Sequence, residues 1–183
     1  AFYSLGTILV LAPTAIRNHA VAKDWVLTTS QAGQNFFIGN NPENLTGMYR
    51  APGFVRPDPK YEEVDFAREA ERLTQRKLKP SAVSRFWFRR SWEFIAQRPA
   101  DFVLLMAQKA ALFWNSFEIP DNLDLYFFKR YSLVLRLWLP TFGIVATLGI
   151  VGMVFCLREW RRFWTIYIFV VGDFVSADLL YVF

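Results

Sequence analysis

One polar segment, residues 30–42 (SQAGQNFFIGNNP), is unusually rich in asparagine and glycine. Asn35, Asn40 and Asn41 each offer amide donors and a carbonyl acceptor, a combination that suits sugar hydroxyls and equally suits the backbone of a turn. Asparagines beside glycines are characteristic turn formers. The residue chemistry by itself therefore favours a structural turn over a sugar-binding site.

Two cations lie beside or within apolar segments, where a phosphate would be a suitable partner. Arg17 follows an apolar stretch, at the depth where lipid phosphates lie; the alternative is an ordinary anchor whose charged end reaches the membrane surface. Lys109 lies within an apolar helix and needs a partner such as a phosphate, Glu118 or water. Its alternative is a solvent-facing position on an amphipathic helix. The sequence leaves both pairs of alternatives open.

Long apolar segments must position these residues. Residues 137–157 contain no charged side chain, and about 20 apolar residues in a helix cross the hydrocarbon core of a bilayer. Backbone groups in lipid must be hydrogen-bonded within their own segment, so the span is helical. We expect a membrane helix over residues 133–157, a basic loop over 158–162 and a second membrane helix over 163–183. The fold class is an all-α, polytopic membrane protein.

The chain's first segment and its charges suggest a topology. Residues 1–16 are typical of the end of another membrane helix, and we expect the chain to be part of a longer protein. The short loop 158–162 carries three arginines, which predicts a cytoplasmic location for that loop. Residues 17–132 are then expected outside, in the periplasm beyond a bacterial inner membrane.

The outer region is expected to be irregular over residues 17–60, where Gly, Asn and Pro are frequent. Apolar periodicity and proline positions then predict amphipathic helices over about 61–78, 81–98 and 99–117. Ser81 is suited to cap the second of these.

The placement of the third helix has two alternatives, the membrane interface or the core of the outer domain. Trp87, Trp92 and Trp114 favour the interface, because an indole ring there keeps its polar edge in water.

Composition excludes several classes of function. Hydrophobic residues make up 54% of the 183 residues and the net charge is +5, but the basic residues are scattered or flank apolar runs, which favours membrane contact over nucleic-acid binding. The single cysteine, Cys156, and the single histidine, His19, exclude a disulfide framework, a cysteine-ligated zinc site and a histidine-rich metal site. No cofactor or metal is predicted.

Several motifs in sequence order carry a family resemblance. They are residues 13–18 (PTAIRN), residues 33–42 (GQNFFIGNNP), Arg98-Pro99, Lys109 and residues 113–120 (FWNSFEIP). Between apolar segments and in this order, they resemble the later part of bacterial membrane glycosyltransferases related to the dolichyl-phosphate-mannose protein mannosyltransferases, which belong to the GT-C class. The resemblance runs from about residue 12 to residue 124.

This resemblance implies a multi-span protein that transfers a sugar from a polyprenyl-phosphate carrier to a lipid or protein acceptor. The family's catalytic aspartate lies in the first outer loop, before the matched stretch, so no catalytic residue is expected in this chain. The residues expected to bind the lipid phosphate are Arg17 and Lys109, and those expected to contact the sugar or structure a loop are Asn18, Asn35, Asn40 and Asn41. The alternative function is a non-catalytic structural subunit of a larger membrane complex.

Overall fold

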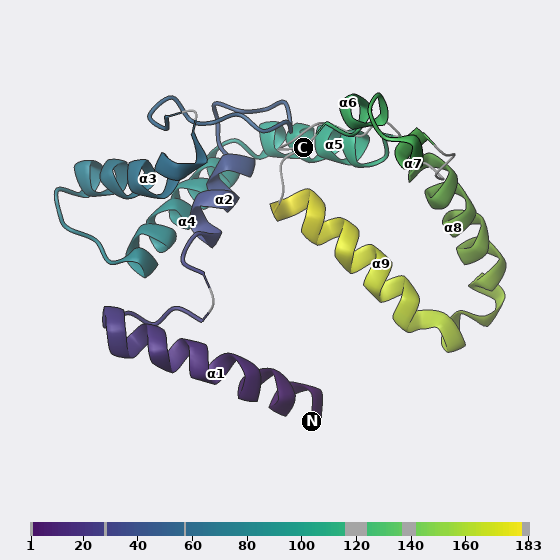
Figure 1. Ribbon diagram of the computed structural model, residues 1–183, viewed down its shortest axis with the longest axis horizontal. Coiled ribbons are helices and arrows are strands. Elements are labelled where there is room, and N and C mark those ends of the chain that lie inside the picture. The colour runs from purple at the N-terminus through teal and green to yellow at the C-terminus, as the bar shows by residue number, and fades with distance from the viewer. Residues whose placement is uncertain (1, 28, 57, 116–123, 137–141, 181–183) are drawn as a thin grey trace.

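The computed structural model describes residues 2–27, 29–56, 58–115, 124–136 and 142–180 (Figure 1). Helices make up 76% of the chain and the described residues form no strand, which confirms the all-α expectation. The elements are α1 (Phe2–Ala22), α2 (Ala32–Gly39), α3 (Pro59–Thr74), α4 (Pro80–Gln97), α5 (Pro99–Phe113), α6 (Leu125–Lys129), α7 (Leu133–Arg136), α8 (Phe142–Cys156), a 3₁₀ turn (Leu157–Glu159) and α9 (Trp160–Leu180).

Helices α3, α4 and α5 form the outer layer, and each begins with a proline in its first turn. Proline suits this position because its missing N–H would have no partner within the helix. The Asp58 carboxylate accepts a hydrogen bond from the Lys60 backbone N–H and caps α3. At the other end Gln75 adopts a left-handed conformation, so α3 ends at Thr74, earlier than the predicted residue 78.

The core of the outer layer is aromatic and lies between α2, α3 and α4. Phe66 is fully buried and Trp87 is 2% exposed, and their rings pack edge to face at 5.1 Å between centroids. The Trp87 indole N–H donates to the Phe66 carbonyl oxygen at 3.2 Å. The expected interfacial position of Trp87 is therefore wrong, because its polar edge is satisfied inside the core. Trp92 and Trp114 are about half exposed.

Helix α2 corrects the prediction that residues 17–60 are irregular. It packs mainly on α4, and the two backbones approach very closely at Gly33. The Gly33 N–H donates to Ser84 Oγ at 2.9 Å, and a Cβ at Gly33 would lie 1.9 Å from the Ser84 carbonyl oxygen. Packing on α4 thus stabilises a short glycine-containing helix whose local sequence resembles a loop.

Helix α1 also departs from expectation, because it continues to Ala22 instead of ending near residue 16. In Figure 1 it lies on the same side of the outer layer as α8 and α9. Its apolar side chains are largely exposed, including Val10 and Val21.

Helices α8 and α9 form the two arms of a hairpin (Figure 1). The Tyr167 hydroxyl of α9 donates to the Met153 carbonyl oxygen of α8 at 2.6 Å. At the open end Phe113 of α5 packs against Phe142 and Phe174, which joins the hairpin to the outer layer. The turn covers Leu157–Glu159 and α9 begins at Trp160, so the predicted loop 158–162 is shorter than expected.

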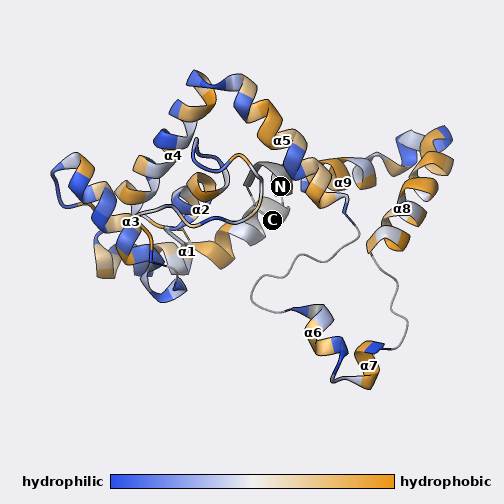
Figure 2. Ribbon diagram, turned by 90° about the horizontal axis from the view of Figure 1, so that it is seen from above, coloured by the Kyte–Doolittle hydropathy of each residue, from blue (hydrophilic) through white to orange (hydrophobic). Residues whose placement is uncertain are grey.

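One helical stretch of the described residues, Phe142–Ala177, is long and apolar enough to cross a membrane, and its most apolar part is not buried inside the protein. This stretch includes both arms of the hairpin, and α8 is predominantly hydrophobic in Figure 2. Residues 133–136 do not begin the span as predicted; they form α7, which packs against α6. Residues 137–141 and 181–183 of the predicted spans lie outside the described residues.

Candidate functional site

A cavity of about 390 Å³ lies where the end of α1 meets the outer layer. Its walls come from α1, the segment that follows α1, α3 and the first residue of α4. The polar residues in the lining are Arg17, Asn18, Asp24, Thr29, Ser30, Gln31 and Glu63. Two of the predicted site residues, Arg17 and Asn18, therefore lie together in one cavity.

The end of α1 places both residues in the wall. Lys23 has a φ of 52°, a left-handed conformation that ends the helix and reverses the chain. The Asn18 amide then donates to the Val26 carbonyl oxygen at 2.9 Å, which holds the returning segment against α1. Arg17 is exposed and forms no ion pair with any residue that the structure describes. Asn18 thus structures the cavity, while the Arg17 guanidinium is available to an anion.

Another part of the lining joins two distant segments of the chain. The Gln31 side-chain amide donates to Glu63 Oε2 at 3.2 Å and joins the start of α2 to α3. Thr29 and Ser30 precede it in the chain and add hydroxyl groups. This part of the lining therefore presents neutral donors and acceptors together with one carboxylate.

Asp24 connects the cavity lining to α4. Its carboxylate accepts hydrogen bonds from the Ser81 backbone N–H at 2.8 Å and from the Ser81 hydroxyl at 2.5 Å. The hydrogen bond from the Ser81 hydroxyl lowers the pKa of Asp24, and the charges of Lys79 and Arg85 lower it further. The prediction that Ser81 caps α4 is wrong. Asp24, 57 residues earlier in the chain, supplies the capping carboxylate.

Lys109 belongs to a second cluster, away from the Arg17 cavity lining. Its side chain is fully buried, so the solvent-facing alternative is wrong. The Lys109 ammonium donates to Asn40 Oδ1 at 3.3 Å, and the Asn40 amide donates to the Phe36 carbonyl oxygen at 3.0 Å. These contacts bring two of the predicted site residues together from α5 and from the end of α2.

The loop beside this cluster packs tightly on α5. Gly47 has a φ of +76°, and a Cβ there would lie 3.0 Å from Lys109 Cγ. Glycine is needed at this position for its backbone conformation as well as for the close contact. Lys109 therefore holds the asparagine loop against α5 through both its charged end and its methylene groups.

The other two predicted asparagines differ from Asn40. Asn41 Oδ1 accepts from the backbone N–H groups of Glu43 and Asn44, at 2.9 and 3.1 Å, and its amide donates to the Phe37 carbonyl oxygen at 2.8 Å. This is the turn-forming role that the sequence favoured. Asn35 is exposed on α2 and does not line the Arg17 cavity.

Sequence reasoning missed the residues that complete the Arg17 cavity. Glu63 lies in the amphipathic helix predicted over about 61–78, where no feature marked it as a site residue, and Thr29 and Gln31 belong to no motif. The end of the apolar segment was the one sequence feature that could have indicated this site. Backbone polar groups at the end of a helix need hydrogen-bond partners, so polar side chains are expected to gather there.

No family model matches this chain, and neither a curated protein nor a solved structure matches it. Residue chemistry and geometry are therefore the basis of the functional argument.

Proposed function

We propose that this chain is part of a polytopic membrane glycosyltransferase that transfers a sugar from a polyprenyl-phosphate donor to a lipid or protein acceptor. Its catalytic aspartate lies outside the chain. The observation that carries the proposal is the cavity at the end of α1, where an exposed arginine shares the lining with neutral hydrogen-bonding groups and the carboxylates of Asp24 and Glu63. The sequence resemblance to GT-C enzymes supports the same assignment.

The chemistry of the cavity suits a phosphate-linked sugar. A planar guanidinium binds two phosphate oxygens at once, so Arg17 is the residue proposed for the carrier phosphate. Hydroxyl and amide groups of Thr29, Ser30 and Gln31 are of the type that binds sugar hydroxyls. Glu63 already accepts a hydrogen bond from Gln31 and is assigned an orienting role, not that of the catalytic base.

Membrane placement is the second part of the proposal. One side of α5 and of Trp114, the residue that follows it, carries exposed apolar side chains, with Val103, Leu104 and Trp114 between 48% and 65% exposed. These positions lie within about 100° of arc on a helix of 3.6 residues per turn. We assign this face to the outer surface of a bacterial inner membrane, with α1 and both hairpin arms in the bilayer and residues 17–132 in the periplasm.

Lys109 is given a different role from Arg17 in this proposal. Because it is fully buried and bonded to Asn40, it holds the asparagine loop in position and does not contact the carrier phosphate in this conformation. The proposed phosphate site thus contains one arginine, Arg17, and Lys109 has a structural role in the separate asparagine cluster.

Donor binding tests the proposal. The intact protein is reconstituted in lipid nanodiscs, and its affinity for the polyprenyl-phosphate sugar is measured for wild type, Arg17→Ala and Arg17→Lys. Charge-assisted contacts contribute about 1.5–3 kcal/mol, so we expect Arg17→Ala to weaken binding roughly 10- to 150-fold. Arg17→Lys recovers only part of the affinity, because an ammonium lacks the planar fork.

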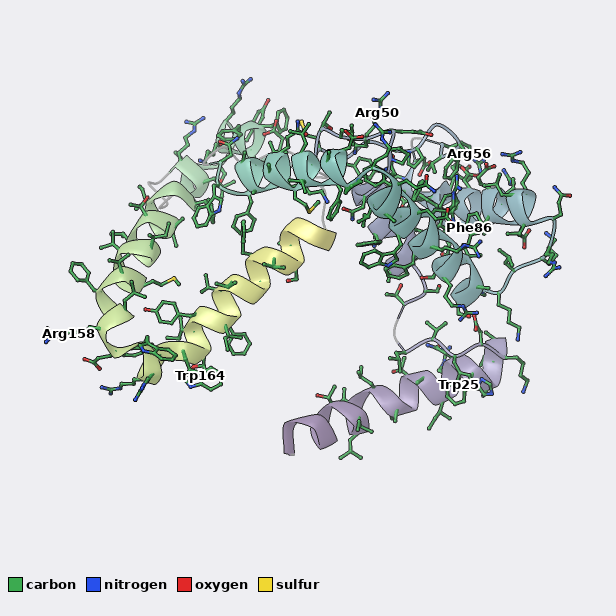
Figure 3. The ribbon with its side chains drawn as sticks, turned by 180° about the vertical axis from the view of Figure 1, so that it is seen from behind. Trp25, Arg50, Arg56, Phe86, Arg158 and Trp164 are labelled. Atoms are coloured by element: carbon green, nitrogen blue, oxygen red, sulfur yellow. The ribbon has the colours of Figure 1, made fainter. Side chains whose placement is uncertain are left out.

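Arg50→Ala is the matched control. Arg50 is also an exposed arginine, and Figure 3 shows it on the far side of the outer layer from Trp25 and the end of α1. Equal, small losses for Arg17→Ala and Arg50→Ala would reduce Arg17 to a membrane anchor. If a normally folded Lys109→Ala variant lost most of its donor affinity while Arg17→Ala bound the donor like wild type, the phosphate site would move to α5.

A structural subunit of a larger membrane complex is the second candidate. The exposed apolar surface of the hairpin favours it, since such a surface can pack against other membrane helices as well as against lipid. Sequencing the complete gene separates the two functions. An upstream multi-span region with an acidic motif in its first outer loop supports the transferase, and a gene without that motif supports the subunit.

A further inference from the structure

The corner where α1 meets the start of α4 combines exposed cations with exposed apolar side chains. We define this α1–α4 corner by the cations Lys23, Lys79 and Arg85 and the apolar residues Val21, Trp25 and Leu27. All six are exposed, with Val21 at 74% and both Trp25 and Leu27 at 66%.

Two hydrogen bonds fix the side chains of Lys79 and Arg85 at this corner. The Lys79 ammonium donates to the Lys23 carbonyl oxygen at 2.6 Å, and the Arg85 guanidinium donates to Ser81 Oγ at 3.4 Å. Ser81 in turn donates to Asp24. The charges of Lys79 and Arg85 therefore act on one nearby carboxylate, that of Asp24.

That carboxylate does not neutralise the exposed surface. Asp24 is 6% exposed, and its oxygens are already occupied by the backbone N–H and hydroxyl of Ser81. The surface presented to a partner is consequently positive. Ser81 supplies the hydrogen bonds to the Asp24 carboxylate, and the ends of the Lys79 and Arg85 side chains are exposed beside it.

The apolar half of the corner continues the surface of α1. Val21 is on the last turn of that helix, and Trp25 stacks on His19 of the same helix with ring centroids 4.1 Å apart. Figure 3 shows Trp25 at the end of α1. An indole beside basic residues at the end of an apolar helix is the arrangement found at the level of lipid head groups.

We propose that the α1–α4 corner binds the head groups of anionic phospholipids in the leaflet that faces the outer layer. Lys23, Lys79 and Arg85 contact the phosphates, and Trp25 and Leu27 insert at the boundary between head groups and acyl chains. This inference needs α1 to lie in the bilayer. It does not depend on the donor, on Arg17 or on any transfer reaction.

The experiment measures lipid selectivity in the full chain reconstituted in phosphatidylcholine bilayers. Spin-labelled phosphatidylglycerol and spin-labelled phosphatidylcholine are compared by electron paramagnetic resonance, which gives their relative association with the protein. The test variant is Lys79→Gln/Arg85→Gln. Its matched control is Lys60→Gln/Arg50→Gln, which removes one exposed lysine and one exposed arginine outside the corner.

We expect the wild type to prefer phosphatidylglycerol over phosphatidylcholine. In the test variant this preference should fall by a factor of about three or more, because each cation near an anionic surface strengthens binding by up to roughly fivefold. The control keeps the wild-type value. The hairpin arginines contribute equally to every variant, so the difference reports the corner alone.

Two further arms separate charge from folding. Lys79→Arg/Arg85→Lys keeps both charges and is expected to keep the preference, whereas about 1 M salt removes it from the wild type. A wild type without a preference, a preference that survives in Lys79→Gln/Arg85→Gln, or an equal loss in the control would overturn the proposal. Donor affinity measured on the same samples tests the transferase assignment separately, because Arg17 is intact in all of them.

Discussion

The outer layer and the hairpin use aromatic residues in opposite ways. In the outer layer Phe66 and Trp87 are 0% and 2% exposed, and they pack against each other in a core. In the hairpin Phe155 and Phe169 are 78% and 79% exposed. The two regions have comparable side chains, so the difference lies in what surrounds them.

This contrast separates a region with an internal core from a region whose apolar side chains are exposed. A region that buries its apolar groups internally is stable beside water, because that burial supplies its folding free energy. A region that leaves such groups exposed presents an apolar surface that suits contact with lipid or with other apolar helices. Phe113, Phe142 and Phe174 join the two regions, and the predictions below test how separate they are, from the largest effect to the smallest.

The largest effect is expected from truncation of the aromatic core of the outer layer. Trp87→Ala leaves a large cavity beside Phe66 and should lower the unfolding free energy of the outer layer by about 3–5 kcal/mol. Hydrogen exchange of α3 and α4 amides in the reconstituted full chain measures it. Phe169→Ala, on the exposed surface of α9, should change the same amides by less than about 0.5 kcal/mol. Similar losses from both variants would show that the regions share one core.

Gly33 tests the closest approach inside the outer layer. Gly33→Ala adds a Cβ 1.9 Å from the Ser84 backbone oxygen, so α2 must move away from α4 at a cost of about 1–3 kcal/mol. Gly53→Ala is the control, since a Cβ there meets nothing within 4 Å. Exchange rates of α2 amides report the change. Unchanged α2 protection in Gly33→Ala would contradict the tight packing described here.

A substitution of Lys109 tests whether its buried contact with Asn40 stabilises the outer layer. Lys109→Met keeps most of the side-chain volume but leaves Asn40 Oδ1 without its ammonium donor, which should cost about 1–3 kcal/mol. The α5 amides should exchange faster, while the exposed control Lys60→Met stays within about 0.5 kcal/mol of wild type. Equal stability of Lys109→Met and wild type, together with loss of donor binding, would instead assign Lys109 a ligand.

The smallest expected effect is a pH dependence of the unfolding free energy that comes from Asp65 in α3. Hydrogen bonds from Arg56 hold the pKa of Asp65 at about 2, below its ordinary value of 3.8. A lowered folded-state pKa means that ionised Asp65 stabilises the fold above about pH 4, and that this contribution disappears as the pH falls toward 2. Unfolding of wild type and Asp65→Asn should therefore differ most at neutral pH and converge near pH 2.

A matched control for the pH experiment is Glu43→Gln, which removes an exposed carboxylate from a loop. Its difference from wild type should stay small at every pH. A gap between wild type and Asp65→Asn that persists at pH 2 would show that the Arg56 contact does not depend on the charge of Asp65.

Local sequence predicted the helices of the outer layer well, because their signals are short-range. Apolar periodicity identified α3 and α4, and Pro80 and Pro99 marked the first turns of α4 and α5. The apolar run of the hairpin was equally clear. Each of these signals depends on residues within one or two turns of each other, which is the range over which a helix is specified.

The partners of individual residues depended on the tertiary structure. Trp87 is of a residue type that is common at membrane interfaces, yet its indole N–H donates a hydrogen bond to the Phe66 carbonyl oxygen in the core. Lys109 meets Asn40, 69 residues away, and Asp24 caps a helix 57 residues further on. Helix α2 exists because α4 covers it. No local pattern encodes such pairings.

The sequence by itself thus determined the helices α3, α4 and α5 and the apolar run of the hairpin, because these signals repeat along the chain with the period of a helix; it did not reveal α2. Only the tertiary structure decided which polar groups face each other. Arg17 and Glu63 line one cavity because α1 ends, reverses at Lys23 and returns beside α3. A long-range meeting of this kind follows from the packing of whole helices, and packing is a property of the folded chain.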